Sequence, residues 1–402
     1  MTLVEELKAR GFIEQMTYED ELTDKLNNSK MTFYAGFDCT ADSLTVGHYL
    51  LICLFKHLQN AGHKAICMIG GGTTMIGDPS GRTDMRRLMS REFIDNNAKH
   101  FEIQLSSLLN MDGAHGIFMN NKDWLLDLNF LDFVREIGTQ FSVKRMLQFD
   151  CYKNRLDQGL TFFEFSYMLM QSYDYLQLYR KHHCTLQVGG NDQWSNMLGG
   201  YELVKQMEGE TVYNMTIPLL TTADGVKMGK SMGNAIWLSK EKTSPFDLYQ
   251  YFRNVDDRDV IRFMKLLTFL PLNEIARIEK EEEINRQKEI LAYEITKDIH
   301  GKNEADKAIK TARALFSGQI NAENMPEFVL EDMEGDEIGL LALLVKAGLC
   351  NSNSEARNLI TGGGISIDNK KINDPKIRIS KSELEKEIII QKGKKVFLKV
   401  RI

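Results

Sequence analysis

The chain of 402 residues is longer than one ordinary domain, and this length predicts two or three domains. Hydrophobic residues make up 43% and charged residues 26%, a balance typical of a globular protein with a sizeable core. No apolar run approaches the ~20 residues of a membrane span, and the start lacks a signal-peptide stretch, so we expect a cytoplasmic protein without membrane contact.

Cysteine spacing and charge distribution give two further clues. The six cysteines form no C-x-x-C pair, which favours reduced, mostly buried thiols. The net charge is −6, yet the residues from 339 to the end contain 13 Lys and Arg against 6 Asp and Glu. This basic segment indicates contact with nucleic acid, with a solvated lysine-rich tail as the open alternative.

Strand and helix signals alternate along the first two hundred residues. After the first strand, Asp42 or Ser43 is predicted to cap a helix that stops at Ala61. The predicted strands are 31–37, 64–69, 116–121 and 185–190. This β-α-β pattern predicts an α/β fold with a doubly wound parallel sheet, whose ligands bind beyond the carboxyl ends of the strands.

Composition divides the chain into four parts. We expect a nucleotide-binding domain with a helical insertion around 122–180, a second domain that opens on a glycine-rich loop and continues as helices, an acidic linker, and a small basic α+β module. Their predicted boundaries are 1–225, 226–322, 323–338 and 339–402.

Two glycine-rich segments do not match the common nucleotide-binding motifs. The glycines of GGGTTMIG (70–77) lack the G-x-G-x-x-G spacing, and GVKMGKS (225–231) has one residue too few for a P-loop. A dinucleotide-dependent dehydrogenase and a P-loop NTPase are therefore not supported.

A more specific pattern follows the first strand, in YAGFDCTADSLTVGH (34–48). Thr40, Gly47 and His48 fall where a strand gives way to a helix, and free amides at a helix start favour anions. Gly47 has no Cβ and lets a flat adenine approach the backbone. The alternatives are a packing glycine and a core histidine.

Two further segments carry polar side chains suited to a ligand. Lys227 and Lys230, flanked by glycines, can fold over a triphosphate, although a solvated basic loop is the alternative. Tyr167, Gln171 and Asp174 share one face of a helix predicted over 161–180, with exposure of the Asp as the alternative.

Taken together, these motifs resemble those of bacterial-type tyrosyl-tRNA synthetases, a family of class I aminoacyl-tRNA synthetases. YAGFDCTADSLTVGH resembles the family's YxGFDPTADSLHxGH, and KMGKS resembles its KMSKS-type loop. SYMLMQSYDY and QVGGNDQW correspond to its tyrosine-pocket and ribose segments, and residues 339–402 resemble an S4-type RNA-binding module.

The resemblance implies roles for individual residues. The phenol and ammonium of L-tyrosine would be held by Tyr34, Asp78, Tyr167, Gln171 and Asp174. The ATP-binding residues would be Gly36, Asp38, Gly47, His48, Gly190, Asp192, Gln193 and Lys230. The catalytic set would be Thr40, Thr45, His48, Lys227, Lys230 and Ser231.

Two positions depart from the family pattern. Thr45 stands where the family usually has the first histidine of H-x-G-H, and Cys39 replaces a proline. A threonine can donate one hydrogen bond to pyrophosphate but carries no imidazole, so we expect reduced or redistributed stabilisation of the transition state.

The resemblance implies a tyrosine–tRNA ligase that converts tyrosine and ATP to tyrosyl-adenylate and pyrophosphate, then charges tRNA-Tyr. Mg²⁺ is expected to accompany ATP without a protein metal site. We expect a homodimer through about 122–160, and tRNA contact through 245–322 and the S4-like module. The alternatives are a catalytically silent relative, a class I synthetase for another amino acid such as tryptophan, and a different adenylyltransferase.

Overall fold

The computed structural model describes residues 1–80, 89–156, 159–228, 235–316, 327–331, 333, 335–368, 370–393 and 396–402. The chain forms two compact units. The first unit consists of residues 1–239 and 261–278, and the second consists of residues 240–260 and 279–402.

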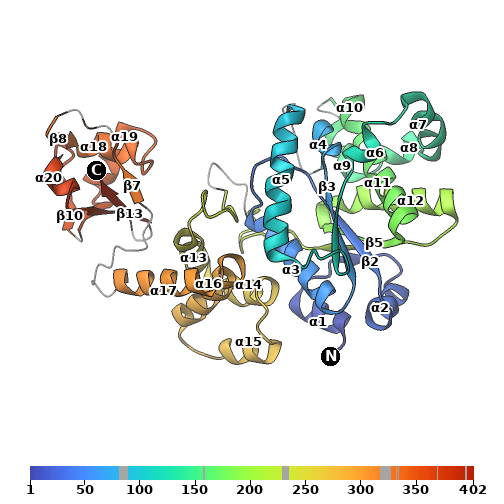
Figure 1. Cartoon of the computed structure of the whole chain (residues 1–402). Coiled ribbons are helices and arrows are strands. Elements are labelled where there is room, and N and C mark those ends of the chain that lie inside the picture. Colours follow the sequence, from blue (N-terminus) through green and yellow to red (C-terminus); the bar gives the residue numbers. More distant parts are fainter. Residues whose placement is uncertain are drawn as a thin grey trace. The chain divides into compact units, whose positions relative to one another are not determined.

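The first unit is built on a six-stranded sheet (Figure 1). In chain order its strands are β1 (Gln15–Met16), β2 (Thr32–Phe37), β3 (Lys64–Ile69), β4 (Gly116–Asn120), β5 (Cys184–Gly190) and β6 (Tyr213–Ile217). They lie in the order β1-β6-β5-β2-β3-β4, and all pairs are parallel except β1 with β6. The predicted parallel sheet and its four predicted strands are confirmed, and an antiparallel edge strand is added.

The strand order reverses direction at the centre of the sheet. From β2 the chain moves outward to β3 and β4, then returns to β5 on the other side of β2 and continues to β6. Tyr34 of β2 pairs with Gln187 of β5, so the carboxyl ends of these two strands open beside each other. Such a switch point is where doubly wound sheets bind their ligands.

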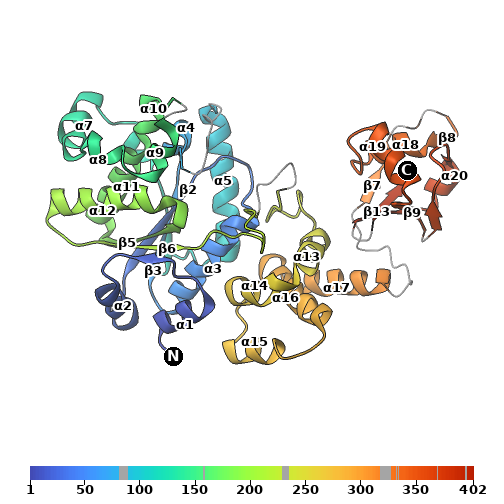
Figure 2. The ribbon, with the colours of Figure 1, turned by 180° about the vertical axis from the view of Figure 1, so that it is seen from behind.

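Helices cover both faces of this sheet. Figures 1 and 2 show α3 (Val46–Asn60) and α5 (Arg91–Leu108) on one side, with α11 (Tyr167–His182) and α12 (Trp194–Glu208) on the other. The shorter helices are α1 (Leu3–Arg10), α2 (Glu19–Asn28), α4 (Thr73–Ile76), α6 (Lys122–Leu125), α7 (Phe130–Glu136), α8 (Val143–Met146), α9 (Asp150–Leu156) and α10 (Phe162–Phe165).

Two predicted helix boundaries were wrong. The N-cap of α3 is Thr45 rather than Asp42 or Ser43, because the Ser43 hydroxyl donates to the carbonyl of Leu44 instead of capping a helix. The helix predicted over 161–180 is divided into α10 and α11 at Ser166, whose hydroxyl bonds back to the carbonyl of Phe163 at 2.8 Å.

The packing of α11 against α12 depends on two glycines. A Cβ on Gly199 would lie 2.7 Å from the Ser172 hydroxyl oxygen, and one on Gly200 would lie 3.0 Å from the Tyr175 ring. Real Cβ atoms essentially never approach to 2.7 Å, and at 3.0 Å the neighbour must shift slightly, so glycine at these two positions lets the helices pack closely. This contact holds α11, the helix that carries the predicted polar stripe.

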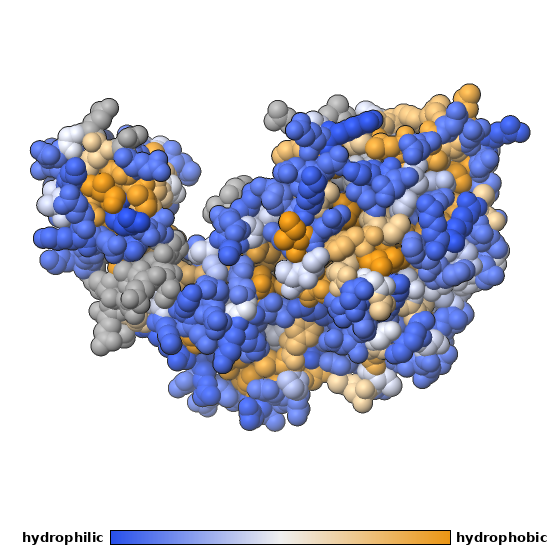
Figure 3. Space-filling model, viewed as in Figure 1, coloured by the Kyte–Doolittle hydropathy of each residue, from blue (hydrophilic) through white to orange (hydrophobic). Residues whose placement is uncertain are grey.

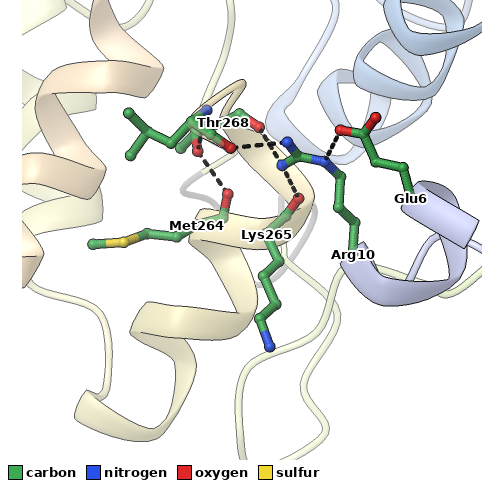
Figure 4. A network of polar contacts seen from close by, with 6 residues as sticks. Glu6, Arg10, Met264, Lys265 and Thr268 are labelled. Atoms are coloured by element: carbon green, nitrogen blue, oxygen red, sulfur yellow. Dashed lines mark hydrogen bonds and ion pairs between the residues drawn. The ribbon is translucent and has the colours of Figure 1, made fainter. Parts of the chain in front are cut away.

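Residues 261–278 return to the first unit and carry most of α14 (Val260–Leu267) together with α15 (Leu272–Ile278). Arg10 of α1, which is buried, donates to the carbonyls of Lys265 and Thr268 at 3.2 Å and pairs with Glu6 at 2.9 Å (Figure 4). It also donates to the carbonyl of Leu270 at 2.8 Å. Carbonyls at a helix end lack partners within the helix, so this guanidinium fastens the end of α14 to α1.

The second unit begins with helices. They are α13 (Pro245–Arg253), α16 (Ile284–His300) and α17 (Lys302–Phe316), and they confirm the all-helical pattern predicted after Pro245. Ser244 caps α13 and Pro245 occupies its first turn, where a missing N–H does no harm.

The second unit ends in a small module with a core of its own. Its elements are β7 (Glu327–Val329), β8 (Glu337–Gly339), α18 (Leu340–Lys346), α19 (Asn353–Thr361), β9 (Ile365–Ile367), β10 (Lys370–Ile372), β11 (Arg378–Ser380), α20 (Lys381–Leu384), β12 (Ile388–Lys392) and β13 (Val396–Arg401). The strands form a sheet in the order β10-β9-β12-β13-β7 and a separate pair, β11-β8. Strand β7 lies within the acidic stretch whose composition predicts a linker.

Candidate active site

A cavity of about 290 Å³ opens at the carboxyl ends of β2 and β5. Strand alternation places Tyr34 and Gly36 on the same face of β2, and Asp38 is the first residue after the strand. Fourteen predicted site residues line the cavity: Tyr34, Gly36, Asp38, Thr40, Thr45, Gly47, His48, Asp78, Tyr167, Gln171, Asp174, Gly190, Asp192 and Gln193. The polar stripe of α11 and the end of β2 therefore face one space.

Of the remaining three predicted residues, only Lys227 belongs to the described part of the chain, and it does not line the cavity. Lys227 lies close to it, with its ammonium nitrogen 3.3 Å from a carboxylate oxygen of Asp192. Lys230 and Ser231 lie outside the described residues.

The deepest part of the cavity is organised around Asp174, which is fully buried. The Trp124 indole N–H donates to one carboxylate oxygen at 2.7 Å, and the Asn121 amide donates to the other at 3.0 Å. Burial raises the pKa of Asp174 to about 8, and these two donors act in the opposite direction. Because both donors are fixed, the carboxyl group is held in one orientation.

The hydroxyl of Tyr34 lies in the same buried region. Its side chain is fully buried, and no group in the described ranges makes a hydrogen bond with the hydroxyl. Its ring meets the ring of Tyr175 edge to face, with centroids 5.1 Å apart. A buried hydroxyl without a partner is unfavourable, so this one is suited to a ligand that supplies the missing hydrogen bond.

A second carboxylate, Asp38, is held by two hydroxyl groups. Thr73 donates to Asp38 at 2.9 Å, and Tyr167 donates to its other oxygen at 3.1 Å. Asn121 in turn donates to the Thr73 hydroxyl at 2.9 Å, which links Asp38 to the Asp174 cluster. A Cβ on Gly70 would lie 2.2 Å from the Asp38 carboxylate, so the glycine run at 70–72 permits close packing beside the site.

A third group of polar side chains surrounds Asp78. Its carboxylate accepts hydrogen bonds from Gln193 at 2.6 Å and from Asn196 at 3.4 Å. Gln171 and Gln187 also line the cavity, and their buried side-chain oxygens have no hydrogen-bond donor within the described part of the chain. The unused oxygens here are hydrogen-bond acceptors. They favour a ligand group that only donates hydrogen bonds and carries positive charge, such as an ammonium.

The outer part of the cavity is formed by the start of α3. Gly47 is exposed, and a Cβ there would meet the Met228 carbonyl and the Thr45 hydroxyl oxygen at an ordinary 3.6 Å, so none of the residues that the structure describes crowds this position. The backbone on either side of residues 229–234 is anchored: the Met228 amide donates to Leu220, and the Ile236 carbonyl accepts from Val46. The ends of that segment therefore lie beside the helix start.

Several residues of this site were not predicted. Asn121 is the last residue of a predicted strand, at the sheet edge where ligands bind. Its position could therefore have been used to predict it as a site residue. Gln187 stood in a quoted motif without a role. Thr73 and Asn196 stand within a few residues of Asp78 and Gln193 but match no motif that indicates a role, and Trp124 reaches Asp174 from 50 residues away. Within the described ranges no group of three or more His, Cys, Asp or Glu side chains is arranged to hold a metal ion.

Family comparisons cover almost the whole chain. Residues 26–317 match the family described as tRNA synthetases class I (W and Y), and residues 319–400 match the tyrosine–tRNA ligase SYY-like C-terminal domain. The tyrosine–tRNA ligase of Lachnoclostridium phytofermentans is 49% identical over 97% of both chains. That of Acetivibrio thermocellus is 48% identical over 100% of this chain and 99% of its own.

Solved structures give the same result for the fold. The C-terminally truncated mitochondrial tyrosyl-tRNA synthetase of Aspergillus nidulans superposes with a TM-score of 0.71 at 32% identity, covering 78% of this chain and 94% of its own. The tyrosyl-tRNA synthetase of Archaeoglobus fulgidus, complexed with L-tyrosine, shares the fold with a TM-score of 0.60 at 17% identity, over 76% of this chain and 99% of its own. The chain therefore belongs to the class I tRNA synthetases of the tryptophan and tyrosine group.

Proposed function

We propose that this chain is a tyrosine–tRNA ligase, which forms tyrosyl-adenylate and pyrophosphate from tyrosine and ATP and then transfers the tyrosyl group to tRNA-Tyr. The observation that carries the proposal is the unpartnered Tyr34 hydroxyl in the same buried pocket as Asp174. Relatives that are 48–49% identical along almost their full length bear this name.

The buried end of the cavity suits a phenol better than the other aromatic side chains. A phenol hydroxyl donates one hydrogen bond and accepts another, so it can donate to Asp174 and accept from Tyr34. An indole N–H donates but accepts nothing, and phenylalanine offers neither. Either of these substrates leaves a buried polar group without a partner, which costs about 1–3 kcal/mol.

The amino-acid backbone of tyrosine is proposed to lie toward Asp78, Tyr167 and Gln171. The carboxylate of Asp78 attracts the ammonium, and the Gln171 oxygen is a free acceptor. This orientation directs the substrate carboxylate toward ATP. That carboxylate attacks the α-phosphorus directly, so the first step needs neither a protein nucleophile nor a general base.

ATP is proposed to lie across the start of α3. Gly47 and His48 face the adenosine, Gly36 and Gly190 leave room for it, and Asp192 binds the ribose. Asp38 and Gln193 line the same space.

Catalysis then rests on positioning and on charge. Thr40 and Lys227, together with Lys230 and Ser231 on the evidence of the resemblance, would stabilise the charge on the leaving pyrophosphate. Mg²⁺ is proposed to accompany ATP and to neutralise phosphate charge. Chelation of Mg²⁺ should therefore abolish activation and leave tyrosine binding unchanged.

Pyrophosphate exchange with each of the twenty amino acids tests this function. We expect ATP–pyrophosphate exchange with tyrosine alone, followed by charging of tRNA-Tyr in preference to other tRNAs. Exchange with tryptophan would identify the chain as a synthetase of the other specificity. Binding of tRNA without exchange for any amino acid would identify a catalytically silent relative.

Contact with tRNA is proposed for the second unit, through those helices of the 245–322 region that belong to it and through the S4-like module at 339–402. The excess of Lys and Arg in that module favours binding to the phosphate backbone, which weakens as salt rises. We expect KM for tRNA to increase steeply between about 50 and 200 mM salt. The exchange reaction, which needs no tRNA, should change little over the same range and serves as the control.

A homodimer is proposed through α7 and α8. Phe130 and Leu131 of α7 are 66% and 74% exposed, and Val134 and Val143 are also exposed. Figure 3 shows apolar surface over these helices, and such patches mark interfaces. Leu131→Asp should shift the sedimentation coefficient from dimer to monomer, whereas Ile103→Asp, at an exposed apolar position of α5, should not. A monomeric unmodified protein would contradict this proposal.

A cytoplasmic location is proposed from the cysteines, because all six are free and buried. No helix in the described ranges is long and apolar enough to cross a membrane.

A further inference from the structure

Cys39 stands where the family usually has a proline, and the exchange adds a hydrogen-bond donor to the turn after β2. A proline has no backbone N–H and fixes one backbone dihedral angle through its ring. Cys39 does have an N–H, which donates to the hydroxyl oxygen of Thr74 at 2.9 Å. Both residues are buried. A proline at position 39 could not make this contact.

The carbonyl of Cys39 is held as well. The side-chain amide of Asn97, a fully buried residue of α5, donates to it at 2.9 Å. The N–H of Cys39 belongs to the peptide group before its Cα, and the carbonyl belongs to the peptide group after it. Because each peptide group is planar, holding both groups fixes the two soft dihedral angles between them. Hydrogen bonds to α4 and α5 therefore fix the backbone of this turn.

The turn bears on the site because the neighbours of Cys39 on both sides line the cavity. Asp38 precedes it and Thr40 follows it, and both are part of the lining. Thr73 donates to the Asp38 carboxylate at 2.9 Å, so two consecutive threonines of α4 hold two consecutive residues of the turn. Thr74 itself does not line the cavity. It can therefore act on a bound ligand only through the residues that it holds.

We propose that Thr74 is a positioning residue, whose hydroxyl accepts the Cys39 N–H and thereby holds Thr40 in place at the cavity. Asn97 completes this arrangement from the carbonyl side. The role of Thr40, stabilisation of phosphate charge, rests on the proposed function, whereas the hydrogen bond does not. The hydroxyl of Thr74 thus supplies a constraint that the ring of a proline supplies in the family pattern.

The rate of adenylate formation tests the positioning role. Thr74→Val keeps the shape of the side chain and leaves the Cys39 N–H without an acceptor, so it should slow adenylate formation about threefold to tenfold at unchanged tyrosine affinity. Thr74→Ser keeps the hydroxyl and should stay close to the unmodified rate. Thr296→Val removes another buried threonine hydroxyl, which donates to the Ala292 carbonyl within α16, and should not alter the rate. An undiminished rate in Thr74→Val would remove Thr74 from this role.

A double-mutant cycle separates the hydrogen bond from any other effect of position 74. Cys39→Pro removes the N–H and supplies the ring, so it should stay close to the unmodified rate. In this background Thr74→Val should cause no further loss, because the donor that needs the hydroxyl is gone. Cys39→Ala keeps the N–H and loses only the thiol, so Thr74→Val should slow the reaction there as it does in the unmodified protein. Equal losses in the proline and alanine backgrounds would contradict the proposal.

Hydrogen exchange tests the contact without any substrate. In protein labelled with ¹⁵N in its cysteines, the Cys39 amide signal is identified by its absence from Cys39→Ala. We expect this amide to exchange about tenfold faster in Thr74→Val, with the other five cysteine amides as internal controls. Unchanged exchange of the Cys39 amide would overturn the proposal whatever the activity. If the unmodified protein shows no tyrosine-dependent pyrophosphate exchange, the proposed function fails and this measurement still stands.

Discussion

The two ends of the cavity are built in different ways. At the phenol end, Asp174 and Tyr34 are fully buried, and Asp174 is held from behind by Asn121 and Trp124. At the phosphate end, Gly47 is exposed and the side chain of Lys227 is 53% exposed, with Asp192 as its ion-pair partner. Groups fixed before binding suit discrimination between amino acids, whereas exposed cations suit charge that develops during the reaction. The comparison predicts separable effects on affinity and on rate.

The largest effect is expected at the phosphate end. Lys230→Ala should slow adenylate formation about 10²–10³-fold, because one donor to developing charge is lost. Tyrosine affinity should not change. Rapid-quench kinetics measure the rate, and equilibrium dialysis measures the affinity. Lys240→Ala, a lysine ten residues further along, is the control. A weakened tyrosine affinity in Lys230→Ala would break the proposed division between the two ends.

Asp174→Asn should have the opposite pattern. The amide group would turn a donor toward Trp124 or Asn121, which are themselves donors, and one acceptor for the substrate would be lost. We expect tyrosine affinity to fall about 10–100-fold. Asp123→Asn, at an exposed position of α6, should leave affinity unchanged. Equal affinities in the two variants would remove Asp174 from phenol recognition.

The pH dependence of tyrosine binding sharpens the same point. Burial raises the pKa of Asp174 to about 8, so the carboxyl group of the free protein holds a proton at neutral pH. The substrate phenol donates to the ionised form, so affinity should rise with pH by up to about tenfold per unit below 8 and level off above it. Because the folded pKa exceeds the unfolded one, this group's stabilising contribution falls as pH rises from about 4 to 8. Titration calorimetry should find no such pH trend in the tyrosine affinity of Asp174→Asn, and urea denaturation at several pH values should show that its stability lacks this contribution.

The smallest effects on affinity and stability are expected from removing the hydroxyl group of either of two buried tyrosines. Tyr34→Phe should lower tyrosine affinity about twofold to tenfold, and the free energy of unfolding should not fall, because the lost hydroxyl has no partner. Tyr175→Phe removes a hydroxyl that donates to the Tyr213 carbonyl at 2.8 Å. It should cost about 1 kcal/mol in unfolding free energy and leave affinity unchanged. Urea denaturation and equilibrium dialysis of both variants check this reversal.

The parts of the fold that sequence predicted are those that depend on local patterns. Strands buried on both faces of a parallel sheet have nearly continuous apolar sequences. The apolar segment KAICMI (64–69) was therefore predicted as a strand, and it coincides with β3. The spacing of Tyr167, Gln171 and Asp174 was enough to place them on one helix face, because helix geometry is fixed. Most of the site could be collected in this way, since its residues follow the strands or lie on that face.

The other features of the fold and the site depend on contacts with residues far away in the sequence, which no local pattern indicates. Asp42 and Ser43 are good capping residues, yet Thr45 caps α3: the Ser43 hydroxyl donates to the Leu44 carbonyl, and the Val46 amide donates to the carbonyl of Ile236, nearly two hundred positions later. Trp124 supports Asp174 from 50 residues away, and nothing in its own segment indicates this role. Such choices are made by tertiary contacts that exist only in the folded unit.

The contacts of Arg10 determine how early the first unit can finish folding while the chain is being synthesised. The Arg10 guanidinium donates hydrogen bonds to the carbonyls of residues 265, 268 and 270. These residues leave the ribosome long after the first helix. Until then Arg10 has only Glu6 and water, and burying it would leave a charge without full compensation. We therefore expect α1 to pack against α2 early, whereas burial of Arg10 and the final packing of the first unit wait until about two-thirds of the polypeptide has been translated.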